Sequence, residues 1–176
     1  MIISWLRFEW DLAQLPADAG QSLPPFVLRP AEKADEDVVK KVAISAFNMD
    51  TGWGDVRTAI TEKMSAHIAS AFDKEPPACV VLQHGARIIG VSVLDRAENA
   101  ENHLLTGPCI LHEYRSRGLA SLLLRSSLDT LRTAGLKHAY GIARDKTAAA
   151  RFVYPKFGGK SEHWTQAFEV TPKLAA

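Results

Sequence analysis

The sequence predicts one α/β domain built on a mixed, largely antiparallel sheet flanked by helices. Three observations lead to this prediction. The chain has 176 residues and 47% apolar content, which suits a single domain with a buried core. From Phe26 onward, β-rich runs and runs with helical periodicity follow one another in the order β-α-α-β-β-β-α-β-α-β. Two of the β-rich runs are separated by His84-Gly85, as expected for a hairpin.

The N-terminal residues stand apart from this pattern. We expect residues 1–25 to form an extension and residues 26–176 to form the domain. Within the extension, Leu6, Phe8 and Trp10 alternate with charged residues, which predicts a strand with one apolar face. A stripe of this size is costly to leave in water, so it should cover the domain's own sheet or a second subunit.

Within the domain, the longest predicted helix has the clearest pattern. Its apolar residues follow helical spacing, and Gly135 suits the position just after its end. The predicted elements, in order, are a strand at 26–29, a helix near 38–47, a helix ending near 72, strands at 79–83, 87–95 and 103–111, a helix from 117 to 135, a strand at 137–143, a helix at 146–153 and a strand at 163–170.

Composition excludes several classes of function. Lys and Arg number 21 against 20 acidic residues, and the basic residues are dispersed, so no nucleic-acid or membrane partner is expected. Cys79 and Cys109, the only two cysteines, form neither a disulfide framework nor a metal-ligand set. No apolar run approaches the ~20 residues that span a bilayer. No secretion signal is evident at the start. These observations predict a cytoplasmic protein without a metal centre.

The run Ile110–Leu124 is the most informative segment for function. An apolar, strand-like stretch ends in a charged turn, and Gly118 precedes a strongly apolar helix. The first amides of a helix have no intrahelical acceptor, and the helix dipole adds positive potential there, so the position suits a phosphate. Gly118 would let a ligand approach the backbone, while Arg115 and Arg117 would add positive charge. An ordinary strand–turn–helix connection with solvated arginines is the alternative.

The wider sequence order favours the phosphate-binding interpretation. Arg115–Ala120 reads as [Q/R]-x-x-G-x-[G/A], and a later strand is followed by a helix ending in Tyr154-Pro-Lys-Phe-Gly158. In this order of elements, the segment from Phe26 to Val170 resembles the GNAT superfamily of N-acetyltransferases. The resemblance implies a GNAT-like fold in which the strands around Cys109 and Tyr140 splay into a V-shaped cleft. It also implies acetyl-CoA as cosubstrate, with its pyrophosphate on the loop.

The resemblance further implies which residues contact the cofactor. The strand before the loop would offer main-chain groups to the pantetheine arm, although a proline in that strand has no N–H to give. A threonine replaces the asparagine that is common one turn into the later helix. The implied cofactor-binding residues are Pro108, Cys109, Ile110, Arg115, Ser116, Arg117, Gly118, Leu119, Ala120, Ser121 and Thr147.

Two catalytic residues are predicted. Tyr154 occupies the position of the tyrosine that in this family often protonates the departing thiolate of coenzyme A. Pro155 is expected to push Tyr154 toward an extended conformation. His103, near Glu101 at the start of a strand, is the candidate base, although a surface histidine is the commoner explanation.

The connection between the first two helices is the predicted border of the acceptor site. In proteins of this family it lies beside the acceptor, and here it contains Asp50, Trp53 and Asp55. Carboxylates and an aromatic ring would suit an ammonium group. Ordinary turn chemistry explains the same residues.

The predicted function is therefore transfer of an acetyl group from acetyl-CoA to a primary amine of a small molecule or peptide, by direct attack. The protein is expected to act as a monomer or homodimer. One alternative is a module of the same fold that binds acyl-CoA as a sensor or partner-binding domain without turnover. An unrelated α/β nucleotide-binding domain is a second alternative.

Overall fold

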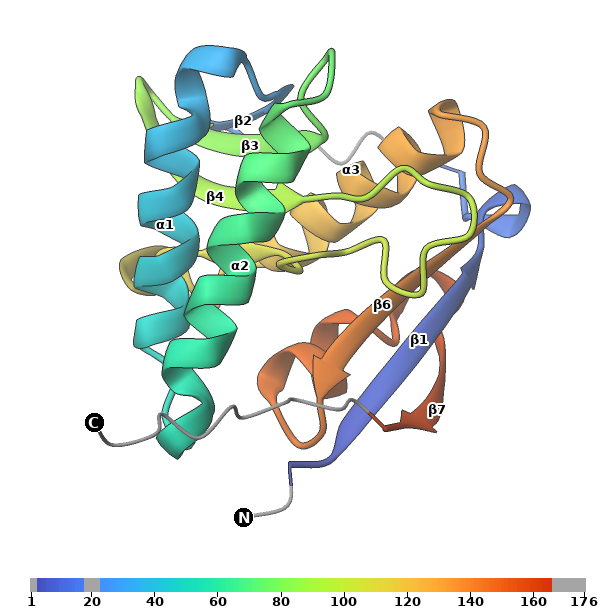
Figure 1. Cartoon of the computed structure of the whole chain (residues 1–176). Helices are drawn as coiled ribbons and strands as arrows, with labels where there is room; N and C mark the ends of the chain where they lie inside the picture. The colour runs from blue at the N-terminus through green and yellow to red at the C-terminus, as the bar shows by residue number, and fades with distance from the viewer. Residues whose placement is uncertain (1–2, 18–22, 166–176) are drawn as a thin grey trace.

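The described part of the chain contains two sheets and three α-helices (Figure 1). The computed structural model describes residues 3–17 and 23–165. The first sheet has the order β2–β3–β4–β5, with every neighbouring pair antiparallel. Its strands are β2 (Phe26–Pro30), β3 (Cys79–His84), β4 (Arg87–Val93) and β5 (Cys109–Ile110). The second sheet has the order β6–β1–β7, with strands β1 (Trp5–Asp11), β6 (His138–Arg144) and β7 (Lys160–Trp164).

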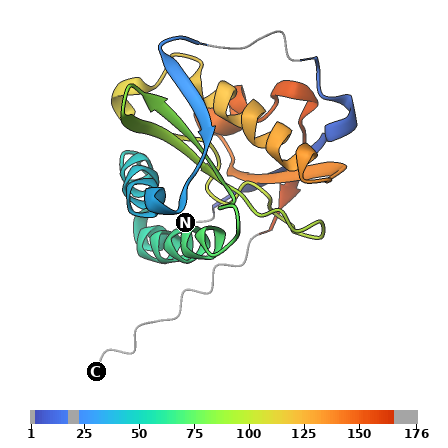
Figure 2. The same ribbon diagram turned by 90° about the horizontal axis from the view of Figure 1, so that it is seen from above.

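The helices cover both faces of the first sheet, as Figure 2 shows. Helices α1 (Glu36–Asn48) and α2 (Arg57–Phe72) lie on one face, and α3 (Leu119–Thr133) lies on the other. Each helix buries the apolar stripe that its sequence period predicts: in α1 the buried residues are Val39, Val42, Ala43, Ala46 and Phe47. The result is an α/β architecture of antiparallel sheets flanked by helices, in agreement with the largely antiparallel sheet that the sequence predicts.

Strand β1 is the central strand of the second sheet. It pairs antiparallel with β6 on one side and with β7 on the other. Phe8 and Trp10 are buried inside the same chain, and the Trp10 indole N–H donates a 2.9 Å hydrogen bond to the carbonyl of Lys156. The predicted strand near residues 6–10 is confirmed, and this strand of the predicted extension holds β6 and β7 together.

The third strand of the predicted set, 103–111, is interrupted. Leu104 still bridges to Leu94, and the Leu105 N–H donates to the Val93 carbonyl at 2.9 Å. The main-chain pairing with β4 then stops and resumes at β5. In the gap, the Thr106 hydroxyl accepts the Val93 N–H at 3.1 Å, in place of a main-chain carbonyl. Gly107, with φ of +63°, and Pro108, which has no N–H, explain why the ladder breaks there.

The segment after β6 forms a wide helical turn. The Tyr154 N–H donates to the carbonyl of Ala149 at 2.9 Å, a five-residue spacing typical of π-helical turns. Tyr154 has φ −63° and ψ −30°, so the prediction of an extended conformation before Pro155 is wrong. This hydrogen bond and the burial of the ring outweigh the local preference of a residue that precedes proline.

The remaining differences lie at the ends of the chain. The last predicted strand, 163–170, falls partly outside the described residues, and β7 ends at Trp164.

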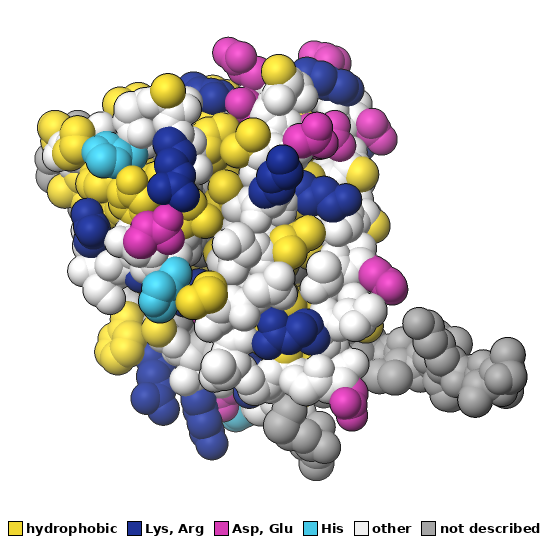
Figure 3. Space-filling view, turned by 90° about the vertical axis from the view of Figure 1, so that its left-hand side faces the viewer, with side chains coloured by type: hydrophobic (Ala, Val, Ile, Leu, Met, Phe, Trp, Pro, Cys, Tyr) yellow, Lys and Arg dark blue, Asp and Glu magenta, His cyan; other side chains and the backbone are white. Residues whose placement is uncertain are grey.

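In the described part of the chain, none of the helices has both the length and the apolar character needed to cross a membrane. Figure 3, which views the left-hand side of Figure 1, shows basic and acidic side chains interspersed on that face, in keeping with the net charge of +1.

Candidate active site

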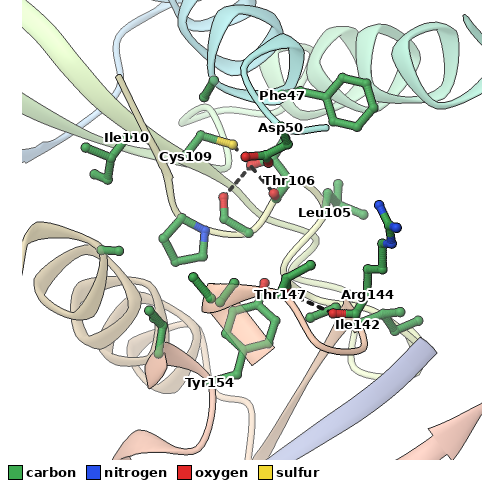
Figure 4. A pocket seen from close by; sticks show the side chains of 18 of the residues that line it. Phe47, Asp50, Leu105, Thr106, Cys109, Ile110, Ile142, Arg144, Thr147 and Tyr154 are labelled. Carbon is green, nitrogen blue, oxygen red and sulfur yellow. Dashed lines mark hydrogen bonds between the residues drawn. The ribbon is translucent and has the colours of Figure 1, made fainter. Parts of the chain in front are cut away.

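A cavity of about 1270 Å³ lies where the two sheets separate. Strand β5 pairs with β4 but not with β6, so its outer edge is free along one side of the cavity (Figure 4). The lining comes from many segments: the start of β1, the end of α1, the α1–α2 connection, α2, the β4–β5 connection, β5, the loop before α3 and the start of that helix, the end of β6 with the turn that follows it, and the end of β7. A ligand here would contact segments that are distant in sequence.

His103 joins the two sheets beside this cavity. It is fully buried, its main-chain N–H donates to the Tyr140 carbonyl at 2.8 Å, and its ring Nδ1 accepts the Tyr140 N–H at 2.9 Å. The ring must therefore be neutral, with Nε2–H donating to the carbonyl of Ala97 at 2.9 Å. Burial lowers the pKa of His103, in agreement with this state. Both ring nitrogens are occupied by backbone, and His103 is not part of the cavity lining.

The free edge of β5 presents the main chain of Ile110 to the cavity. Leu111 N–H donates to the carbonyl of Ile89 on β4 at 2.9 Å. Alternate residues of an antiparallel strand turn their main-chain groups to opposite edges, so Cys109 faces β4 and Ile110 faces away from it. The Ile110 carbonyl accepts a 3.3 Å bond from Arg115, which leaves its N–H for a ligand. Pro108, just before the strand, has only a carbonyl.

The loop before α3 leaves open space at the start of the helix. Gly118 is the N-cap residue, with φ of +77°, and a Cβ added there would meet no atom within 4 Å. The first amides of α3, at Leu119, Ala120 and Ser121, have no acceptor within the helix. These residues and Ser116, which has φ of +61°, line the cavity. The open helix N-terminus on which the phosphate prediction depends is therefore present.

The two arginines of the loop are engaged elsewhere. Arg115 forms a 3.1 Å ion pair with Asp50 and donates to the carbonyl of Ala46 at 2.8 Å, so it ties the loop to the end of α1. Arg117 donates to the Glu113 carbonyl at 3.2 Å and does not line the cavity. The positive charge at the start of α3 comes instead from Lys156, whose Nζ donates to the Ser121 hydroxyl at 2.8 Å. Sequence reasoning missed Lys156 because only folding brings it to α3.

The Tyr154 side chain lines the cavity, yet the residue is only 3% exposed. Its ring makes edge contacts with Phe8 and Trp10, at centroid distances of 5.3 and 5.7 Å. Gly107 lies against the phenol hydroxyl, and a Cβ added at this glycine would collide with it. Burial raises the pKa of Tyr154 well above its ordinary value, and Cys109 adds to the rise. The phenol therefore stays protonated at neutral pH.

Two further predicted residues have local roles. The Cys109 thiol is buried, and burial raises its pKa to about 11, so it is a poor nucleophile. The Thr147 hydroxyl accepts the Ala150 N–H at 3.2 Å and donates to the Arg144 carbonyl at 2.8 Å, which begins the turn that carries Tyr154. Both residues line the cavity. Within residues 3–17 and 23–165 there is no group of His, Cys, Asp and Glu side chains that could hold a metal ion.

The opposite part of the lining is aromatic. Trp5, Phe47 and Trp53, here called the aromatic corner, are each buried. Phe47 and Trp5 both pack against Trp53 in tilted arrangements, with ring centroids 4.9 Å and 6.0 Å away. Figure 4 shows the Arg144 side chain extending from the end of β6 toward Phe47. Of the three residues at the predicted border of the acceptor site, Asp50 and Trp53 line the cavity and Asp55 does not.

His67 of α2 is the only histidine among the described lining residues. It is half-buried, and burial lowers its pKa, as does Lys63, while Asp95 raises it. The imidazole is therefore largely neutral at pH 7 and can accept a proton. Helical spacing alone could not separate His67 from an ordinary surface histidine.

The fold and the site together define an α/β protein with a cleft between splayed strands and an open helix N-terminus on one wall. Residues 47–158 match the model of the acetyltransferase (GNAT) family. The chain therefore belongs to the GNAT acetyltransferase family.

Solved structures agree with this fold at low sequence identity. A GCN5-related N-acetyltransferase from Sphaerobacter thermophilus is 16% identical, with 93% of this chain and 50% of that chain aligned at a TM-score of 0.62. A GNAT-family acetyltransferase from Colwellia psychrerythraea is 14% identical, with 92% and 54% aligned, also at 0.62. The chain thus spans about half the length of these proteins. No curated protein matches it by sequence.

Proposed function

We propose that this protein transfers an acetyl group from acetyl-CoA to a primary amine. The observation that carries the proposal is the continuity of the open N-terminus of α3 with the free edge of β5 along one cavity wall. Such a wall suits a ligand that has a phosphate to place at the start of α3 and an amide-containing arm to place along the edge of β5. At about 1270 Å³, the cavity exceeds the ~300–1,000 Å³ of a typical small-molecule pocket, so it can take two substrates.

The residues of this wall fit acetyl-CoA. The amides of Leu119, Ala120 and Ser121 would bind the pyrophosphate, and Lys156 would add a mobile positive charge there. The Ile110 N–H would pair with the arm of the ligand or polarise the thioester carbonyl. Gly118 leaves the space that the phosphates need.

Proton transfer is the chemical task of the side chains. Acetyl-CoA supplies an activated thioester when bound. The attack forms a carbon–nitrogen bond and breaks the carbon–sulfur bond, so one proton must leave the amine and one must reach the sulfur. We assign Tyr154 as the donor to the sulfur, because its phenol lines the cavity and stays protonated. We assign His67 as the acceptor of the amine proton, directly or through water, in place of His103, whose nitrogens are both engaged.

The test has two parts. Calorimetry should show that acetyl-CoA binds and that ADP binds much more weakly, because ADP lacks the pantetheine arm that β5 would hold. A panel of small amines and peptides should then be screened for release of thiol from acetyl-CoA. Failure of acetyl-CoA to bind would refute the proposal, as would binding without turnover of any amine.

Binding without turnover would instead support a second candidate, a module that senses or presents acyl-CoA. The tight packing of Tyr154 between Phe8 and Trp10 favours this candidate, because it gives the ring a structural role. The two candidates separate at Tyr154→Phe, which should lower turnover only if the phenol takes part in chemistry.

A further inference from the structure

Arg144 enters the cavity as a fixed cation. Its Nη1 donates to the Thr51 carbonyl at 3.3 Å, and its guanidinium carbon lies 4.9 Å from the centroid of the Trp53 ring. Gly52, with φ of +86°, lets the chain pass close by, since a Cβ there would lie 3.0 Å from Arg144 Nη2. The α1–α2 connection is thus shaped around this guanidinium, which reduces the entropy it would lose on binding a ligand.

The charge of Arg144 has no acidic partner. Within the described ranges 3–17 and 23–165, no carboxylate forms an ion pair with it, whereas Arg115 on the other wall is paired with Asp50. A guanidinium carries five N–H donors in a planar fork, and here one of them is used by the Thr51 carbonyl. The remaining donors match the two oxygens of a carboxylate.

A second donor beside Arg144 also lacks an acceptor. The indole Nε1 of Trp53 is the only buried side-chain nitrogen or oxygen in the described part of the chain that has no hydrogen-bond partner. Buried donors are normally satisfied, so such an atom calls for an explanation. It belongs to the ring under the Arg144 guanidinium, and both residues line the cavity. Because Nε1 itself is closed off, the free donors of Arg144 are the groups that a ligand oxygen would reach in this polar corner of the cavity.

The surroundings of Arg144 specify the rest of the ligand. The aromatic corner offers apolar ring surface to the cavity next to the guanidinium. Such a surface favours an apolar body over a chain of hydroxyl groups, because burying unpaired hydroxyls is costly.

We propose that the acetyl acceptor is a small primary amine that also carries a carboxylate and an apolar body, with its carboxylate bound by Arg144. This inference rests on the proposed function, because the amine must reach the thioester. If Arg144 served only to tie the α1–α2 connection to β6, its loss would lower stability and leave no preference for a carboxylate.

The experiment compares acids with their neutral amides at two spacings between amine and carboxylate. The pairs are L-phenylalanine with L-phenylalaninamide, and 4-(aminomethyl)benzoate with 4-(aminomethyl)benzamide. In at least one pair, the wild-type protein should favour the acid by about tenfold or more in kcat/KM, the range expected for a charged hydrogen bond. Intrinsic tryptophan fluorescence gives a readout independent of turnover, because Trp5 and Trp53 line the site.

The variants assign the preference to Arg144. Arg144→Gln should reduce the preference to about twofold or less, with acetyl-CoA affinity unchanged and a small drop in melting temperature from the lost Thr51 and Trp53 contacts. Arg144→Lys should retain part of the preference because it keeps the charge but not the fork. The matched control is Arg151→Gln, an exposed residue outside the cavity lining, which should behave as wild type. Equal use of acid and amide in both pairs would overturn the inference, as would a preference that survives Arg144→Gln. Failure of acetyl-CoA to bind would count against the proposed function alone, since the fluorescence titration still reports on the acids.

Discussion

The two walls of the cleft are built from different kinds of chemical group. The wall formed by β5 and the start of α3 offers mainly main-chain groups: the Ile110 N–H, the first amides of the helix and the space in front of Gly118. The wall formed by the aromatic corner and Arg144 offers side chains from four separate segments. Main-chain recognition tolerates sequence change except where the backbone demands a particular residue. Side chains, in contrast, can be replaced without changing the backbone, so their recognition of a ligand can differ between related proteins. We therefore expect the second wall to determine specificity for the acceptor.

The largest expected effect tests whether β1 is integral to the fold that positions both walls. Trp10→Ala removes a fully buried indole that packs on Phe8 and Tyr154 and donates to the Lys156 carbonyl. The free energy of unfolding, measured by denaturant titration, should fall by about 3–5 kcal/mol, as for other buried aromatic truncations.

The matched control is Glu9→Ala on the same strand. Glu9 is exposed, and its contact with His138 is a surface pair of small energetic value. A loss below about 1 kcal/mol in Trp10→Ala would mean that the N-terminal strand is a dispensable attachment.

The next effect concerns the main-chain wall. Gly118→Glu places bulk and negative charge in the open space at the start of α3, where the pyrophosphate is expected. Like charges brought together cost several kcal/mol, so acetyl-CoA affinity measured by calorimetry should fall about 1000-fold.

Gly135→Glu is the control for backbone strain. Gly135 ends the same helix, also has positive φ, and also has no atom within 4 Å of an added Cβ. Both variants therefore carry the same cost of a left-handed residue, and only Gly118→Glu faces the cleft. If the two variants bind acetyl-CoA equally, the phosphates do not lie at the start of α3.

The contrast between the two walls also explains which features of the fold and of the site could be predicted from the sequence. The element order follows from local patterns, and the open loop before α3 follows from a motif in which Gly118 has a left-handed backbone. The placement of Asp50 and Trp53 beside the cavity was expected only from the family resemblance. The interior place of β1 could not be predicted, because pairing partners more than 120 residues away leave no local signal. The same reason applies to the contact of Lys156 with Ser121 and to the hydrogen bonds that occupy both ring nitrogens of His103: all of them join residues that are distant in sequence or depend on tertiary structure. The conformation of Tyr154 was mispredicted because tertiary packing outweighed the effect of Pro155.

A smaller effect is expected at Tyr154, which lies between the two walls. Tyr154→Phe keeps the ring and its contacts with Phe8 and Trp10 but removes the proton donor. We expect kcat to fall about 100-fold, the lower end for general acid catalysis, with acetyl-CoA affinity unchanged. Because the pKa of Tyr154 is raised, this phenol should add no alkaline limb to the pH profile below pH 10.

Tyr140→Phe is the control for Tyr154→Phe. Tyr140 lies on β6 outside the cavity lining, and its ring would still lie under the Arg7 guanidinium. Its kcat should stay within about twofold of wild type. Equal kcat values for the two variants would assign Tyr154 a packing role only.

The smallest effect is expected at His67, on the side of the cavity where the acceptor would bind. Burial lowers its pKa below the ordinary value of 6.5, so the ring is neutral and able to accept a proton at pH 7. As the pH falls through that lowered pKa, the ring becomes charged and kcat/KM should decline. His67→Gln should lower kcat/KM by about tenfold at pH 7, since water can replace the ring, and should remove this acidic limb.

The free energy of unfolding should also depend on pH through the protonation of His67. The unfolded chain binds a proton at His67 near pH 6.5, whereas the folded protein resists protonation until a lower pH. The contribution of His67 to stability is therefore complete above pH 6.5 and is lost as the pH falls toward the folded pKa, so His67→Gln should be less acid-sensitive than wild type. His138→Gln, an exposed histidine of β6 outside the cavity, is the control for a general effect of removing an imidazole. An acidic limb of kcat/KM that survives in His67→Gln would move the proton acceptor to a carboxylate of the cavity, such as Asp95, and would leave His67 as a half-buried residue of α2.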